Sequence, residues 1–180
     1  MKADQKLVLV GMPGSGKTTL GKRAARLLQF AFFDLDHEIE VQEGRKIPEI
    51  FASNGEGYFR DVETKVLTRL LNSADSFVLS TGGGAPCFNS NMDLINAHAI
   101  SAYLDVSISE LVARLVGGQV SKRPLFAGLS THQVTQKVLE MHALRRPFYE
   151  MAKIKLSGNE LTAEQLVSEW LGFLKIETNR

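Results

Sequence analysis

The chain has 180 residues, a length that suits one ordinary domain burying about two-thirds of its unfolded surface. Hydrophobic residues make up 44% and charged residues 23%, as in soluble globular proteins, and no apolar run approaches the length that crosses a membrane. The net charge of +1 argues against a general role in binding nucleic acid or membranes, and the single cysteine, Cys87, cannot form an internal disulfide, which suits a reducing cytoplasm.

Residues 6–10 form a short apolar run that predicts a buried parallel strand, and a helical pattern covers residues 20–28. Between them, the glycines and the Lys-Thr pair complete the motif G-x-x-x-x-G-K-[ST], which binds a nucleotide polyphosphate in this strand–loop–helix context. Lys17 is expected to reach the β- and γ-phosphates of ATP or GTP, and the Thr18 hydroxyl to ligate Mg²⁺. The expected nucleotide contacts in this segment are Gly14, Ser15, Gly16, Lys17, Thr18 and Thr19.

The second predicted strand, residues 30–33, is followed by Asp34 and Asp36. Side chains two apart on a strand point to the same side, so both carboxylates would face the phosphate loop. One could hold Mg²⁺ or its waters and the other could accept a proton from an attacking hydroxyl, whereas a polar strand end with a helix cap would carry the same residues. Helical patterns then cover residues 39–43, 47–53 and 57–71, with a predicted capping box over residues 53–56.

A third strand, residues 77–80, is interrupted by Thr81 and the glycines at 82–84. At the end of a strand, such glycines allow another molecule to approach the backbone closely. No acidic residue follows this strand, as one does in motor ATPases, and the Asn-Lys-x-Asp signature of signalling GTPases is absent. Asp34 is therefore expected to serve the metal, an arrangement found in small-molecule kinases.

The second half of the chain continues the alternation, with strands predicted at 100–104 and 153–156 and helices after 107, over 132–151 and after 162. Arg123 lies in a basic segment bounded by glycines, which is typical of a hinged lid that neutralises a transferring phosphoryl group. Arg60 and Arg145 are candidates to bind the carboxylate of an acceptor, because guanidinium pairs with carboxylate in a bidentate fork.

Strands that alternate with helices predict an α/β fold of three layers, a five-stranded parallel sheet with helices on both faces and ligands at the carboxyl ends of the strands. We expect one domain over residues 1–180, with a substrate-binding region at about 34–62 and a lid at about 115–128. The first strand begins too near Met1 to leave room for a signal peptide, so we expect a cytoplasmic protein.

Together these motifs resemble the shikimate kinase family over nearly the whole chain. The resemblance rests on separated elements: residues 11–18, Asp34 and Asp36, residues 50–56 with Phe59, Arg60 and Glu63, residues 80–85, Arg123-Pro-Leu, and Arg145-x-Pro-Phe-Tyr149. It implies a P-loop kinase fold like that of nucleoside monophosphate kinases, with a mobile lid. It also implies ATP-dependent phosphorylation of the 3-hydroxyl of shikimate, in aromatic amino-acid biosynthesis. We expect the protein to be a monomer.

The resemblance also implies roles for single residues. Asp36 would hold the acceptor hydroxyls as the candidate base, with Lys17 and Arg123 as the other catalytic groups. Thr18 and Asp34 would hold Mg²⁺, and Arg114 would lie against adenine. The remaining acceptor contacts implied are Arg60, Arg145, Gly82, Gly83, Gly84, Phe51 and Phe59.

Some positions depart from the family pattern without removing a chemical group: the Met12-Pro13 pair in the loop, Leu35 between the two aspartates, Phe126 and Phe148. Two other functions stay open at this point. A related small-molecule kinase such as gluconate kinase would share the loop and the fold, and a non-catalytic ATP-binding regulator would bind nucleotide without an acceptor.

Overall fold

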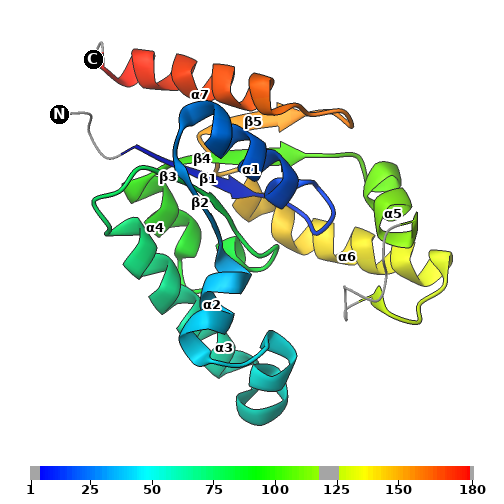
Figure 1. The fold of residues 1–180 in the computed structure, drawn as a ribbon. Coiled ribbons are helices and arrows are strands. Elements are labelled where there is room, and N and C mark those ends of the chain that lie inside the picture. Colours follow the sequence, from blue (N-terminus) through cyan, green and yellow to red (C-terminus); the bar gives the residue numbers. More distant parts are fainter. Residues whose placement is uncertain (1–4, 118–125, 179–180) are drawn as a thin grey trace.

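The computed structural model describes residues 5–117 and 126–178. Within them one parallel sheet holds five strands, in the order β2-β3-β1-β4-β5 (Figure 1). The strands are β1 (Lys6–Val10), β2 (Ala31–Asp34), β3 (Phe77–Ser80), β4 (Ile100–Asp105) and β5 (Ile154–Ser157). The predicted α/β class and the five parallel strands are confirmed.

Burial follows the position of each strand in the sheet. The central strand β1 is buried along its whole length, which explains its continuous apolar sequence. The edge strand β5 alternates instead, with Ile154 and Leu156 buried and Lys155 and Ser157 exposed. The apolar run before the phosphate loop therefore fixes that loop at the centre of the sheet's carboxyl edge.

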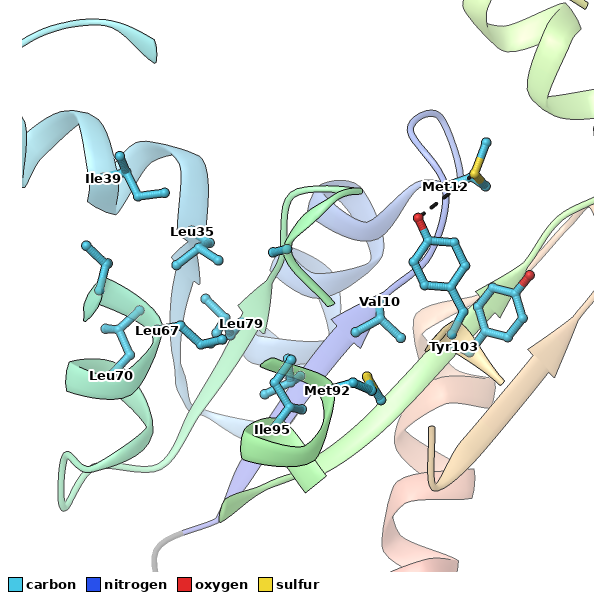
Figure 2. Close-up of a cluster of buried hydrophobic side chains, with 14 of the residues drawn as sticks. Val10, Met12, Leu35, Ile39, Leu67, Leu70, Leu79, Met92, Ile95 and Tyr103 are labelled. Atoms are coloured by element: carbon cyan, nitrogen blue, oxygen red, sulfur yellow. Dashed lines mark hydrogen bonds between the residues drawn. The ribbon is translucent and has the colours of Figure 1, made fainter. Parts of the chain in front are cut away.

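Helices cover both faces of the sheet. On one face α1 (Lys17–Leu28) and α7 (Ala163–Thr178) pack, with Trp170 buried against the sheet as expected from its helical spacing. The other face carries α3 (Ile47–Leu71), α4 (Asn91–His98), α5 (Ile108–Gly117) and α6 (Thr131–Tyr149). Their apolar side chains, with those of α2 (Leu35–Glu43), form the larger core cluster (Figure 2).

Two features of the helices differ from the sequence prediction. The predicted stretches 47–53 and 57–71 join in α3, and the non-helical Gly55 (φ 79°, ψ 177°) marks the break between them. The capping contact lies at the start of α3, where the Lys46 N–H donates to Glu49 Oε2 at 2.9 Å, and not at residues 53–56. The helix α4 and the short 3₁₀ turn η1 (Ala85–Cys87) are not predicted from the sequence, because residues 85–98 lack a clear apolar period.

The close packing of α1 on the sheet generates a stability prediction. A Cβ added at Gly21 would lie 2.7 Å from Phe32 Cε2 and 3.1 Å from Leu9 Cδ1, so Gly21→Ala overpacks this contact. We expect it to lower the free energy of unfolding by about 1–2 kcal/mol, net of the better helix propensity of alanine, as measured by urea denaturation.

Gly172→Ala in α7 is the matched control, since its added Cβ meets no atom within 4 Å. That variant should gain about 0.5–1 kcal/mol from helix propensity alone. Equal stabilisation by both substitutions would contradict the close approach of α1 to β1 and β2.

Candidate active site

The phosphate loop connects β1 to α1 at the middle of the sheet. Gly11 has a φ of 144°, and a Cβ there would lie 2.9 Å from the Leu104 carbonyl oxygen. Gly16, with a φ of 95°, caps the N-terminus of α1 in the left-handed region. The buried Lys17 follows it, and its Nζ donates to the carbonyl oxygens of Gly11 at 2.8 Å and Met12 at 3.0 Å. The ammonium group therefore lies against the loop that would receive the phosphates.

Two hydroxyls and a carboxylate meet where α1, β2 and β3 come together. Thr18 Oγ1 donates to Asp34 Oδ2 at 2.9 Å and lies 3.3 Å from Ser80 Oγ. Thr18 and Asp34 are both expected from the sequence to serve Mg²⁺, and the structure brings them into contact. Ser80, the last residue of β3, was not expected there.

A cavity of about 420 Å³ lies beside the loop, at the carboxyl ends of the strands. It brings together most of the predicted site residues: Gly14, Gly16, Lys17, Thr18, Thr19, Asp34, Asp36, Phe51, Phe59, Arg60, Gly82, Gly83, Gly84 and Arg145. The residues that line it and that the sequence analysis did not assign are Pro13, Ile47, Glu63, Ser80, Thr81 and Phe126.

Asp36 reaches the cavity from the first turn of α2, not from an extended strand. Asp34 and Asp36 therefore face the same cavity, as expected. They do so from a strand end and a first helical turn, because α2 begins at Leu35. Its carboxylate is accessible to solvent through the cavity, yet protein crowds it on most sides. This crowding, with the negative charge of Asp34, raises the pKa of Asp36 to about 6, while Lys17 and Arg60 oppose the rise.

Arg60 is held in place from several directions. Its Nη1 donates to Glu63 Oε2 at 2.8 Å and its Nη2 to Glu56 Oε1 at 3.0 Å, and its guanidinium lies 4.0 Å from the centre of the Phe88 ring. Glu63 is buried, and burial raises the pKa of its carboxyl although the charge of Arg60 opposes this. The signal for Glu63 was its position three residues after Arg60, which places both on one helix face.

The triglycine turn, Gly82 to Gly84, packs against three of the predicted site residues. A Cβ would lie 2.8 Å from Asp36 Oδ1 at Gly82, 3.2 Å from Arg145 Nη1 at Gly83 and 2.9 Å from Arg60 Nη1 at Gly84. None of the three glycines has a positive φ. Space, rather than backbone conformation, therefore favours glycine here, because an added side chain would displace the neighbouring site residues.

Among the described residues, two predicted site residues do not line the cavity. Arg114 packs behind the phosphate loop, where it donates to Glu110 Oε1 at 2.7 Å, to the Gly14 carbonyl at 3.3 Å and to the Asn159 carbonyl. Ser15 is buried inside the loop. Arg123 and most of the predicted lid lie outside the described residues.

Comparison with known proteins gives a consistent result. A family model described as shikimate kinase matches residues 13–175. A shikimate kinase of Novosphingobium aromaticivorans is 41% identical over 175 residues, spanning 92% of this chain and 88% of that protein. The crystal structure of shikimate kinase from Bacteroides thetaiotaomicron matches with a TM-score of 0.87 at 33% identity, covering 95% of this chain and 98% of that one. The structure of shikimate kinase from Acinetobacter baumannii in complex with shikimate matches with a TM-score of 0.83 at 33% identity. The match covers 98% of this chain and 96% of that one.

The environment of Asp36 generates a prediction about its ionisation. Carbon NMR of labelled aspartates should give a midpoint near pH 6 for this carboxyl, because crowding and Asp34 both oppose its ionisation. In the Asp34→Asn variant the neighbouring negative charge is gone, so the midpoint should fall. A wild-type midpoint near the ordinary value of 3.8 would contradict the described surroundings of Asp36.

Proposed function

Because the chain belongs to the shikimate kinase family, we propose that its cavity transfers the γ-phosphoryl group of ATP to the 3-hydroxyl of shikimate. One observation carries the proposal: the triglycine turn packs within contact distance of Asp36, Arg60 and Arg145, in the same cavity that the phosphate loop lines. A ring acid in this space has guanidinium groups for its carboxylate, a carboxylate for its hydroxyl and a phosphate site beside it.

Arg60 and Arg145 form the proposed carboxylate clamp. Each presents a planar fork of N–H donors, which suits a carboxylate better than a lysine ammonium would. Arg60 needs little reorganisation to bind, since Glu63 and Glu56 already fix its guanidinium. Phe51 and Phe59, whose ring centres are 4.6 Å apart, line the same cavity and offer an apolar wall to the ring.

Asp36 is the proposed contact for the reacting hydroxyl. With a pKa of about 6, the Asp36 carboxyl is ionised in most molecules at neutral pH, and it is a stronger base than an ordinary aspartate. It can therefore orient the hydroxyl and accept its proton as the oxygen attacks the γ-phosphorus in line. Phosphoryl transfer asks little covalent chemistry of a protein, so positioning and charge neutralisation supply most of the rate.

ATP is proposed to lie along the phosphate loop, with Gly14, Ser15, Gly16, Thr18 and Thr19 contributing contacts and Lys17 at its terminal phosphates. Arg114, which donates to the Asn159 carbonyl in the loop that follows β5, is proposed to lie on the adenine side, as the resemblance implies. Arg123 and the lid at about 115–128 stay predictions, as does the substrate-binding region at about 34–62.

The residues present fit a magnesium ion accompanying ATP. Thr18 Oγ1, Asp34 Oδ2 and Ser80 Oγ lie together beside the loop and offer oxygen ligands to a metal ion. Mg²⁺ needs few ligands from a protein, because water and phosphate oxygens complete its coordination. Thr18 would hold the ion directly and Asp34 through water. When bound, the ion would neutralise charge on the phosphates.

Within the described part of the chain, no helix combines the length and the apolar character needed to cross a membrane. We propose a cytoplasmic enzyme that acts as a monomer, with one domain over residues 1–180.

The clamp makes a direct prediction for Arg60→Ala. Loss of a charge-assisted fork should raise the KM for shikimate ten- to a hundred-fold, about 1.5–3 kcal/mol, with a much smaller change in the KM for ATP. Arg69→Ala is the matched control, because Arg69 lies on the same helix and pairs with Glu38 at the surface.

Arg60→Ala also leaves the buried Glu63 without its partner, which can destabilise the fold. The double variant Arg60→Ala with Glu63→Gln removes that unpaired charge and should show the same increase in KM. An unchanged KM for shikimate in a folded Arg60 variant would rule out the clamp.

The acceptor itself is tested by measuring ADP release with shikimate, gluconate and nucleoside monophosphates offered separately. We expect ADP release with shikimate and with neither of the other acceptors, because the paired guanidinium groups and Asp36 match a ring acid with a free hydroxyl. Faster release with gluconate would favour the related kinase, and tight ATP binding without release by any acceptor would favour a regulator.

A further inference from the structure

Tyr149 makes a contact with the triglycine turn that the roles assigned so far do not use. It is the last residue of α6, its side chain is fully buried, and its hydroxyl donates to the Gly83 carbonyl oxygen at 2.5 Å. The same hydroxyl lies 3.9 Å from Met12 Sδ in the phosphate loop, the contact that a dashed line marks in Figure 2. Burial raises the pKa of Tyr149, so the group keeps its proton at neutral pH and acts as a donor.

This hydrogen bond fixes the orientation of one peptide group. The Gly83 carbonyl and the Gly84 N–H belong to the same planar trans peptide, so they point in opposite directions. With its oxygen held by Tyr149, the peptide directs the Gly84 N–H away from that side chain. Within residues 5–117 and 126–178 this N–H donates no hydrogen bond to the protein, and Gly84 lines the cavity.

The neighbour of Gly84 indicates what the N–H would bind. A Cβ at Gly84 would lie 2.9 Å from Arg60 Nη1, so the backbone here runs directly beside the guanidinium. A carboxylate held by Arg60 would have a further oxygen lone pair within reach of a backbone donor, and such charge-assisted bonds are strong.

We propose that Tyr149 is a positioning residue for the acceptor: by holding the Gly83 carbonyl it presents the Gly84 N–H to the carboxylate of the bound acid. The inference rests on the proposed function and goes beyond it, since Tyr149 itself does not line the cavity. Because Tyr149 lies four residues after Arg145 on α6, the same side chain also ties the helix that carries Arg145 to the triglycine turn.

The chain supplies a matched control in Tyr103. Its ring packs on that of Tyr149 with 5.3 Å between centres, it is equally buried, and its hydroxyl donates to Asp105 Oδ1 at 3.0 Å, outside the cavity. Tyr149→Phe and Tyr103→Phe therefore each remove one bonded hydroxyl from the same aromatic stack, and only the first frees the Gly83 peptide.

Steady-state kinetics separate the two variants. Tyr149→Phe should raise the KM for shikimate about 5- to 20-fold and leave the KM for ATP within about twofold, because only acceptor binding loses an oriented donor. Tyr103→Phe should leave both values within about twofold. Equal effects of the two variants, or an equal rise in both KM values for Tyr149→Phe, would overturn the inference in favour of a purely structural role.

A second measurement does not depend on the variant folding. In the wild-type protein labelled at glycine, the Gly84 amide resonance should shift when shikimate is added without nucleotide. Absence of the shift in the wild type would overturn the inference. A wild type that does not phosphorylate shikimate would contradict the proposed function instead, whereas an active wild type with a normal Tyr149→Phe would contradict this inference alone.

Discussion

The absence of side chains at Gly82, Gly83 and Gly84 is the constraint on which the candidate site depends. Asp36, Arg60 and Arg145 come from three different helices, and each lies within 3.2 Å of the position that a Cβ on one of these glycines would take; at Gly83 the nearest atom is Pro13 Cδ, at 2.8 Å. The turn therefore sets how closely a carboxylate and two guanidinium groups can approach one another. Because β3 pairs with β1, the same turn also lies beside the phosphate loop. This short backbone segment thus lies against both the candidate acceptor residues and the phosphate loop.

Charge balance explains why the cavity tolerates so many ionisable groups. Among the described residues, its lining holds three acidic side chains, Asp34, Asp36 and Glu63, and three basic ones, Lys17, Arg60 and Arg145. An anionic nucleotide and an anionic acid would make the filled cavity strongly negative, so further cations are needed. Magnesium beside Thr18 and the predicted lid residue Arg123 are the groups that would supply them.

Much of this arrangement could be predicted from the sequence, because strand, glycine loop and helix follow one another in a pattern with a known physical purpose. Asp34 and Asp36 line the same cavity, as the sequence predicts, but the predicted reason is wrong. An extended Asp-x-Asp segment would keep residues 34–36 in a strand, whereas α2 already begins at Leu35. The glycine triplet is expected to admit another molecule and does line the cavity, but the sequence does not show that Asp36, Arg60 and Arg145 pack against it. The contact of Tyr149 with Gly83 joins residues 66 apart, and no local pattern reports such a pairing.

The most direct test of the account is a crystal structure of this protein with shikimate and a non-hydrolysable ATP analogue bound together. The account predicts the carboxylate of the acid between Arg60 and Arg145, one oxygen at the Gly84 N–H, and the 3-hydroxyl at Asp36 facing the terminal phosphate. An acid bound with its carboxylate away from both arginines, or with its hydroxyls remote from Asp36, would contradict it.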